Sequence, residues 1–121
     1  VRHCMDTGMP VFPGVCTPTD IEMALEYGLG AVKFFPAEAI GGVRTLKALA
    51  APYAMMKFIP TGGINPSNLK SYLSLDCVIA CGGSWMVKPQ LCADGRFDQV
   101  EQLARAAVEI ARGPNSLGAT S

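Results

Sequence analysis

Four short apolar runs recur along the chain at nearly equal intervals, and each ends in proline or glycine. They are MPVFPGV (9–15), AVKFFPA (31–37), MMKFIPTGG (55–63) and CVIACGGSW (77–85). Their first residues are 22, 24 and 22 positions apart, which leaves room for a helix between each pair of runs. Runs that are continuously apolar and rich in Val, Ile and Phe are typical of strands buried on both faces of a parallel sheet. The spacing therefore predicts an α/β fold of about four βα units.

The segments between the runs carry helix signals. Thr17-Pro18 is a predicted N-cap followed by a first-turn proline, and Tyr27-Gly28 is the predicted stop. Asn65-Pro66 repeats the cap-and-proline device before SNLKSYLSL. The remaining predicted helices are residues 43–51, which Pro52 halts, and 98–112, with an apolar stripe on one face. The polar residues 113–121 are predicted to form a disordered tail.

Charge and hydropathy exclude several classes of function. Lys+Arg and Asp+Glu number 10 each in 121 residues, so the formal net charge is zero. A surface for nucleic acid or an anionic membrane needs an excess of basic residues. No apolar run approaches the roughly 20 residues of a membrane span. Only 17% of the residues are charged, against about 25% in ordinary soluble domains. Either something buries an unusual share of this surface, or part of the fold is missing.

Cysteine and histidine usage argues against a metal centre. The five cysteines are too scattered for a CxxC motif, and His3 is the single histidine. Structural zinc sites need four nitrogen or sulfur ligands at close spacing, so we expect no metal. Free and mostly buried thiols in a reducing cytoplasm are the simpler expectation. The cysteines are Cys4, Cys16, Cys77, Cys81 and Cys92.

Glycine pairs follow the last two predicted strands. Thr61-Gly62-Gly63 and Gly82-Gly83-Ser84 lie where parallel α/β folds collect their ligands, at the carboxyl ends of strands. Glycines there let backbone N–H groups approach an anion closely, and phosphate commonly binds at such loops in (β/α)8 barrels. The alternative is that the glycines only permit tight turns.

Lys33 is the second candidate for chemistry, because it lies inside the apolar segment AVKFFPA. Desolvation of an ammonium group lowers its pKa, and a neutral amine is a nucleophile that forms a Schiff base with ketones. Alternatively, Lys33 faces the helix side of the sheet and extends to solvent. Lys57 has the same local setting in KFIPTG, and spacing alone does not choose between the two lysines. Glu38, five residues after Lys33, is a candidate acid/base or, more simply, a charged residue in the first turn of a helix.

Four segments in this order resemble a known family: PVFPGVCTPTDI, GLGAVKFFPAEAIGGV, KFIPTGGINPSNLKSYL and IACGGSWMV. The chain is similar over residues 1–112 to the 2-keto-3-deoxy-6-phosphogluconate (KDPG) aldolase family, which also cleaves 4-hydroxy-2-oxoglutarate. The resemblance implies a (β/α)8 TIM barrel, a homotrimer, and a class I mechanism without metal or cofactor, in which a covalent lysine imine with pyruvate is an intermediate. It places the four βα units at strands five to eight, so that residues 1–112 are the C-terminal half of a barrel whose beginning is absent from this sequence.

The same resemblance assigns roles to residues. Lys33 is the Schiff-base lysine, Pro13 and Phe35 line the pyruvate pocket, and Thr61 lies beside the reacting carbons. The phosphate-binding residues it implies are Gly62, Gly63, Gly82, Gly83 and Ser84. The implied substrates are small keto acids: KDPG, cleaved to pyruvate and glyceraldehyde 3-phosphate, or 4-hydroxy-2-oxoglutarate, cleaved to pyruvate and glyoxylate.

The glutamate acid/base of the family, on an early strand, has no counterpart in this chain. Two alternatives follow. One is a half-barrel without activity that binds only phosphate ligands or a complementary half. The other is a different phosphate-binding barrel, such as an isomerase or a phosphate synthase, which shares the glycine loops but does not need Lys33. Four strands of a barrel leave open edges and an uncovered apolar face, so we also expect association or instability.

Overall fold

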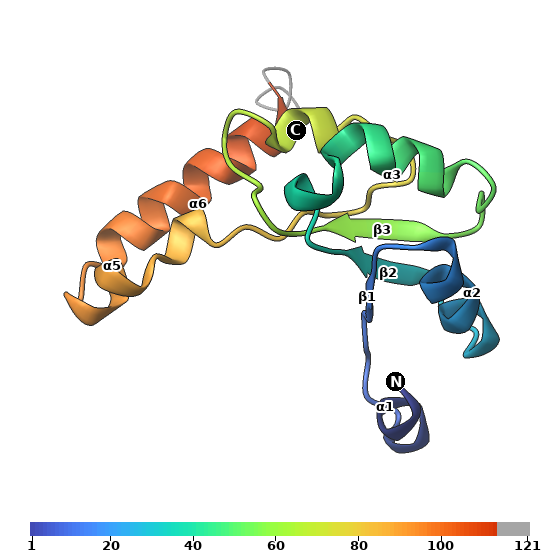
Figure 1. Ribbon diagram of the computed structural model, residues 1–121. Helices are drawn as coiled ribbons and strands as arrows, with labels where there is room; N and C mark the ends of the chain where they lie inside the picture. Colours follow the sequence, from blue (N-terminus) through green and yellow to red (C-terminus); the bar gives the residue numbers. More distant parts are fainter. Residues whose placement is uncertain (114–121) are drawn as a thin grey trace, which may run out of the picture.

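The chain forms a small parallel sheet with helices packed against it (Figure 1). The computed structural model describes residues 1–113, so the predicted tail lies, apart from Gly113, outside the described residues. In chain order the elements are α1 (Arg2–Thr7), β1 (Gly14–Val15), α2 (Pro18–Glu26), β2 (Ala31–Phe34), the 3-10 helix η1 (Glu38–Ile40), α3 (Gly42–Ala50), β3 (Lys57–Pro60), α4 (Leu69–Leu73), the 3-10 helix η2 (Trp85–Val87), α5 (Pro89–Ala93) and α6 (Phe97–Arg112).

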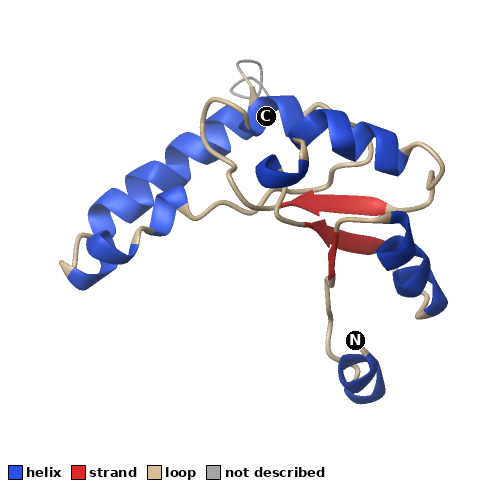
Figure 2. Cartoon of the chain, viewed as in Figure 1, coloured by secondary structure: helices blue, strands red, loops and turns tan. Residues whose placement is uncertain are grey.

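The sheet has the order β1-β2-β3, and both strand pairs are parallel. Lys33 lies at its centre, in register with Gly14 of β1 and Ile59 of β3. Helices α2 and α3 connect successive parallel strands, which confirms the predicted α/β class. Figure 2 shows α5 and α6 extending away from the sheet on the left and α2 on the right, with α1 standing apart below the segment that leads into β1.

The fourth predicted strand is wrong as a regular element. Residues 77–85 run parallel to β3 but form only two isolated bridges, Phe58 with Val78 and Thr61 with Gly82. This segment is at the edge of the sheet, and its pairing with β3 is limited to these two points. The first predicted run is also shorter than expected, since only Gly14–Val15 of residues 9–15 is strand. Prolines that lack an N–H group precede these two residues and cannot extend a ladder.

The predicted cap of α2 is confirmed. The Thr17 hydroxyl accepts a hydrogen bond from the Asp20 amide at 3.2 Å, and the Asp20 carboxylate accepts from the Thr17 amide at 2.9 Å. This reciprocal capping box satisfies backbone donors that the first helical turn leaves open. Pro18 occupies the first turn, as its fixed φ favours.

The other helix predictions are correct to different degrees. Residues 43–51 and 98–112 match α3 and α6 to within one residue at each end. The Asn65 side chain does accept hydrogen bonds from the amides of Ser67 and Asn68, but α4 begins only at Leu69. Helices α1 and α5 and the two 3-10 helices were not predicted, because none of them is long enough to show an apolar period.

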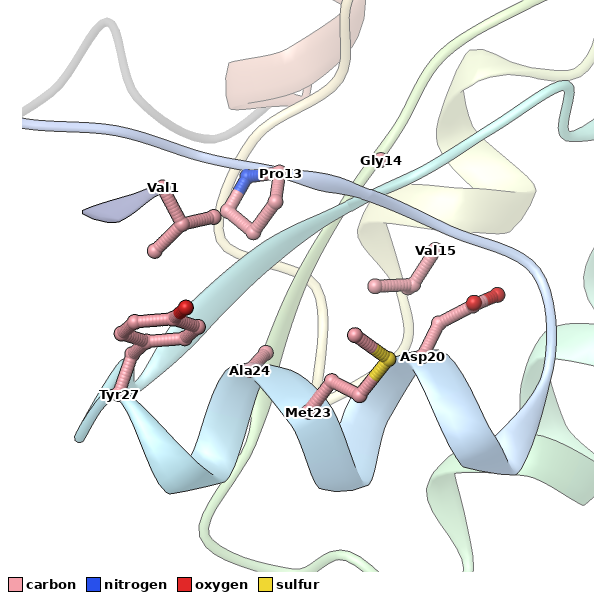
Figure 3. A pocket seen from close by; sticks show the side chains of 8 residues that line it. All are labelled: Val1, Pro13, Gly14, Val15, Asp20, Met23, Ala24 and Tyr27. Carbon is pink, nitrogen blue, oxygen red and sulfur yellow. The ribbon is translucent and has the colours of Figure 1, made fainter. Parts of the chain in front are cut away.

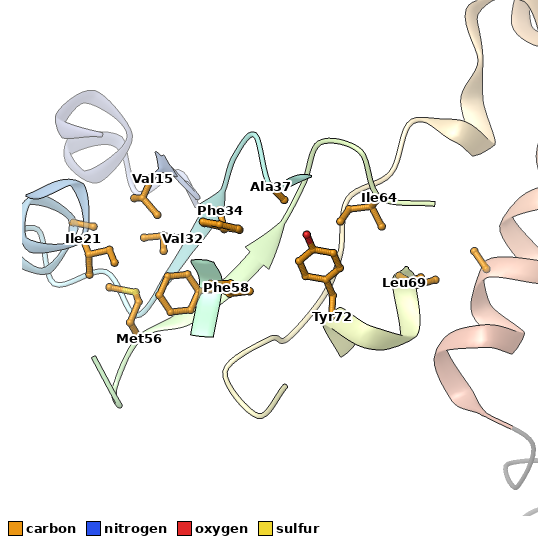
Figure 4. Packing of buried hydrophobic residues seen from close by; sticks show 13 residues of the cluster. Val15, Ile21, Val32, Phe34, Ala37, Met56, Phe58, Ile64, Leu69 and Tyr72 are labelled. Carbon is orange, nitrogen blue, oxygen red and sulfur yellow. The ribbon is translucent and has the colours of Figure 1, made fainter. Parts of the chain in front are cut away.

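The core lies on one face of the sheet. Side chains alternate between buried and half-buried along β2 and β3, and Val32, Phe34 and Phe58 are fully buried. They pack with side chains of the covering helices, including Ile21 of α2 and Tyr72 of α4 (Figure 4). The cluster also contains Val15, Ala24, Ala37, Leu46, Met56, Ile64, Leu69 and Ala107.

The opposite face of the sheet has no comparable cover among residues 1–113. Lys33 and its register partner Ile59 are half-buried there. Ile79, which is adjacent to the bridged Val78, has a side chain that is 54% exposed. The prediction that the strands are buried on both faces is therefore wrong for the described chain, whereas an exposed apolar face is what the sequence led us to expect.

All five cysteines are free, but they are less buried than predicted: Cys16 and Cys92 are exposed and the others are only partly buried. In the described part of the chain, no three His, Cys, Asp or Glu side chains gather as a metal site would require. No helix within residues 1–113 combines the length and the apolar character needed to cross a membrane.

Candidate active site at the carboxyl ends of the strands

Lys33 projects from the uncovered face of the sheet. Because Val32 and Phe34 on either side of it point into the core, strand alternation places the Lys33 side chain on the other face. Its backbone amide donates to the Pro13 carbonyl at 2.9 Å, which fixes this part of β2 beside β1. The ammonium nitrogen Nζ lies 4.5 Å from the ring centroid of Phe35, a cation–π contact. Within residues 1–113, this Nζ makes no hydrogen bond.

Lys57 has a different environment. It begins β3 and pairs with Ala31, so it is nearer the amino end of the sheet than Lys33. Its Nζ donates to the backbone carbonyl of Asp76 at 3.0 Å. Lys57 therefore joins the start of β3 to the segment after α4. The sequence did not distinguish the two lysines, but the structure gives them different environments.

A depression of about 400 Å³ lies at the carboxyl ends of β2 and β3. Seven of the nine predicted site residues line it: Phe35, Thr61, Gly62, Gly63, Gly82, Gly83 and Ser84. Ile64 and Val87 complete the lining and were not predicted. Both are apolar residues beside the glycine loops, and nothing in the sequence distinguishes them from core residues. None of the lining residues is charged, so the polar groups available to a ligand here are hydroxyls and backbone amides.

The two glycine loops meet because the second is bonded to the end of β3. The Gly82 amide donates to the Pro60 carbonyl at 2.9 Å, and Gly82 bridges to Thr61. A Cβ atom on Gly82 would lie 2.7 Å from Thr61 Oγ1, so only glycine allows this approach. Gly62 and Gly63 both have positive φ, at 100° and 77°, a conformation that other residues adopt at a cost.

Backbone hydrogen bonds also join the loop after β2 to the loop after β3. The Thr61 amide donates to the Phe34 carbonyl at 2.9 Å, and the Ala37 amide donates to the Thr61 carbonyl at 2.8 Å. The Glu38 amide then donates to the Gly62 carbonyl at 3.1 Å. The end of the Lys33 strand and the first glycine loop are therefore one connected piece of backbone.

Pro13 is the predicted site residue that the structure places elsewhere. It lines a separate pocket of about 150 Å³ between β1 and α2 (Figure 3). Val1, Met23 and Tyr27 surround it there. The structure does not bring the Pro13 side chain into the depression beside the glycine loops. Lys33 also does not line that depression. Its ammonium group lies against the ring of Phe35, and Phe35 does line the depression.

Two ionisable groups close to the loops are perturbed. Tyr72 donates from its hydroxyl to Glu38 Oε1, and burial, together with this bond, raises the pKa of the Tyr72 hydroxyl. Burial raises the pKa of the Cys81 thiol to about 11, so the thiol next to Gly82 is protonated at neutral pH. Glu38 is among the candidate residues that the sequence provides, but Tyr72 is not, because nothing in the sequence around Tyr72 signals this contact.

These features define a class of protein. It is a parallel α/β protein with a half-buried lysine amine on the open sheet face and a glycine-rich cradle at the carboxyl ends of the strands. The arrangement can supply an amine nucleophile and backbone N–H donors to an anion.

The chain belongs to the KDPG and KHG aldolase family. The sequence model of that family matches residues 1–103. The 2-dehydro-3-deoxy-phosphogluconate aldolase of Treponema pallidum is 49% identical over 110 residues, which are 91% of this chain and 52% of that protein. The chain therefore spans about half the length of the curated relatives it matches.

Solved structures agree with this membership. KDPG aldolase of Legionella pneumophila, with pyruvate captured as a covalent carbinolamine, has a TM-score of 0.80 and 35% identity, covering 88% of this chain and 54% of that one. The Zymomonas mobilis 2-keto-3-deoxy-6-phosphogluconate aldolase with 3-phosphoglycerate has a TM-score of 0.77 and 36% identity, covering 88% and 49%. Both neighbours are aldolases of the TIM-barrel family.

Proposed function

We propose that residues 1–112 form the C-terminal half, strands five to eight, of a (β/α)8 class I aldolase. Its substrates are KDPG, cleaved to pyruvate and glyceraldehyde 3-phosphate, and/or 4-hydroxy-2-oxoglutarate, cleaved to pyruvate and glyoxylate. The observation that carries the proposal is the environment of Lys33. Its amine lies on the open sheet face against Phe35, which lines the depression, whereas the amine of Lys57 donates a hydrogen bond to a backbone carbonyl.

The proposed reaction begins when the neutral Lys33 amine attacks the C2 ketone of the keto acid. The carbinolamine loses water to give a protonated imine, and a base removes the proton of the C4 hydroxyl. The C3–C4 bond then breaks, and its electron pair moves toward the imine nitrogen to give an enamine, while C4 leaves as the aldehyde. Protonation of the enamine at C3 and hydrolysis release pyruvate and restore the lysine. The carbinolamine captured in the Legionella pneumophila relative is the first intermediate of this type.

We propose that Phe35 and Thr61 contact the reacting part of the substrate, and that the glycine loops hold its phosphate. We include Pro13 because its carbonyl accepts the hydrogen bond of the Lys33 amide, although its side chain lines another pocket. The depression that the loops line supports this role, because backbone N–H groups bind phosphate without needing a charged side chain. The 3-phosphoglycerate in the Zymomonas mobilis relative shows that a phosphorylated three-carbon acid binds to that protein. The phosphate-binding residues in the proposal are Gly62, Gly63, Gly82, Gly83 and Ser84.

A second candidate is a half-barrel that binds phosphate ligands or a complementary half but does not turn over. One observation favours it: no carboxylate is among the residues that line the depression in the described chain. The C4 hydroxyl of a substrate bound there therefore has no carboxylate base among the lining residues. Detectable aldol cleavage by the purified 121-residue chain would exclude this second candidate.

The test of the lysine is reductive trapping. The chain is incubated with pyruvate and sodium borohydride, digested, and analysed by mass spectrometry. We expect the reduced pyruvate adduct on the peptide that contains Lys33 and its loss in Lys33→Ala. The matched control is Lys57→Ala, which should retain the label. An adduct on Lys57, or no adduct on a wild-type chain that is folded by circular dichroism, would contradict the assignment of Lys33.

The partner in this proposal is a small keto acid, without metal or organic cofactor. We further propose that the whole protein is a homo-oligomer, a homotrimer as the family resemblance implies, and that it acts in the cytoplasm. The five free thiols support the latter, since a reducing compartment preserves them.

A further inference from the structure

Glu38 and Tyr72 form a contact that the proposed reaction does not use. Tyr72 comes from α4 and its side chain is fully buried in the core. Its hydroxyl donates to Glu38 Oε1, at the start of η1. Figure 4 shows the Tyr72 ring among the apolar side chains, with its hydroxyl directed toward the loop that contains Ala37.

The stem of the Glu38 side chain touches the proposed phosphate loop. A Cβ atom on Gly63 would lie 2.6 Å from Glu38 Cβ and 2.7 Å from Glu38 Cγ. The Glu38 carboxylate is thus one bond beyond a carbon that packs against Gly63. On its other side, a Cβ atom on Gly42 would lie 3.1 Å from both Glu38 Oε1 and the Tyr72 hydroxyl. The carboxylate lies next to both Gly42 and the Tyr72 hydroxyl, and Glu38 is not among the residues that line the depression.

We propose that Tyr72 is a positioning residue that holds the Glu38 carboxylate against α4, and so keeps a negative charge out of the phosphate-binding loop. The inference rests on the proposed function, since it assumes that Gly62 and Gly63 receive an anion. Without the hydroxyl, rotation about the side-chain bonds of Glu38 brings its carboxylate toward the amides of that loop. There it competes with a phosphate for the same N–H donors and repels it.

The chemistry of Tyr72 suits this role. Because burial raises the pKa of its hydroxyl, the proton needed for donation to Glu38 stays in place at neutral pH and above. The packing of its ring against the core also fixes the position of the donor. A donor on a flexible exposed side chain would hold the carboxylate less well.

The experiment is a titration of the 121-residue chain with inorganic phosphate at low ionic strength, followed by the NMR amide shifts of the two glycine loops. For Tyr72→Phe we expect about five- to tenfold weaker phosphate binding, the scale of a partly screened like charge near the site. Glu38→Gln keeps a side chain that can accept from Tyr72 but removes the charge, and should bind at least as tightly as wild type. The double variant, Tyr72→Phe with Glu38→Gln, should also bind phosphate like wild type, because it lacks the negative charge that Tyr72 holds in place.

Two variants separate this role from general packing. Glu38→Asp leaves the core unchanged and draws the carboxylate back from the Tyr72 hydroxyl, so it should weaken phosphate binding as Tyr72→Phe does. The matched control is Tyr53→Phe, which removes another tyrosine–glutamate bond, from the Tyr53 hydroxyl to Glu22 at 2.9 Å, far from the loops. It should not alter phosphate binding.

The outcomes are distinguishable. If wild type shows no phosphate shifts in the glycine loops, the proposed phosphate site is wrong and this inference falls with it. If wild type binds and both Tyr72→Phe and Glu38→Asp bind equally well, only the inference about Tyr72 is wrong. If the double variant is as weak as Tyr72→Phe, Tyr72 acts through packing and not through the charge of Glu38, which also overturns the inference.

Discussion

Gly63 shows how one missing side-chain atom determines the geometry of the site. Its φ of 77° costs a substituted alanine about 1–2 kcal/mol, and the contact with Glu38 adds roughly 1–3 kcal/mol of overpacking. We predict that Gly63→Ala lowers the free energy of unfolding by the sum of both terms. The control is Gly95→Ala, where φ is 66° but nothing lies within 4 Å of the new Cβ, so that only the first cost applies. Equal losses in urea denaturation would contradict the close packing of Glu38 on Gly63.

Cys81 reports on burial beside the second glycine loop. With a pKa of about 11, only on the order of one thiol in a thousand is ionised at pH 8. We predict that iodoacetamide modifies Cys81 much more slowly than the exposed Cys92 in α5. Peptide mass spectrometry over a time course measures both rates in the same sample. Similar rates would mean that the segment before Gly82 opens to solvent readily.

At the scale of elements, the capping box of α2 makes stability depend on pH. Backbone hydrogen bonds, first of all from the Cys16 amide, hold the pKa of the Asp20 carboxyl below its ordinary value of 3.8. A lowered pKa in the folded state means that the stabilisation is fully present above that ordinary value and is lost as the pH falls below it. We predict that Asp20→Asn destabilises the chain at pH 6, and that its difference from wild type shrinks toward pH 3.

Urea denaturation at the two pH values measures this difference. The control is Asp98→Asn, because the Asp98 carboxylate accepts no hydrogen bond within residues 1–113. A constant effect of Asp20→Asn across the range would show that its charge does not matter. Thr17→Ala removes the other half of the box and should cost about 1 kcal/mol at either pH, the usual value of an N-cap.

Elements with strong local signals were predictable, and elements defined by their neighbours were not. Helix α2 and strands β2 and β3 could be predicted because their signals lie in neighbouring residues. These are the Thr17-Pro18 cap and the apolar runs around Lys33 and Lys57. Residues 77–85 are as apolar, yet a regular strand also needs continuous pairing with its neighbour, and here the pairing with β3 is limited to two isolated bridges. The same limit applies to the site, where glycine spacing identified the cradle but no pattern could show that Tyr72 reaches Glu38.

At the scale of the whole molecule, one face of the sheet is the dominant feature. The helices cover the face that carries Val32 and Phe58, and the other carries Lys33, Ile59 and the exposed Ile79. In a closed barrel this face would be the interior. The sequence predicted such an apolar face from the low charge fraction and the count of βα units. The side chains that occupy this face could be identified only from the register of β2 with β3.

An uncovered apolar face, with open strand edges beside it, favours association of chains. We predict that sedimentation velocity finds species larger than a monomer, in proportions that rise with concentration. Ile79→Lys should weaken the association by at least about 1.5 kcal/mol, roughly tenfold in the dissociation constant, because it places a charge where apolar surface is buried. Met23→Lys on α2 is the control, since Met23 is 56% exposed against 54% for Ile79 but lies on the helix side. A wild-type chain that stays monomeric and melts cooperatively would contradict this prediction, because the face that carries Lys33 would then be stable without association.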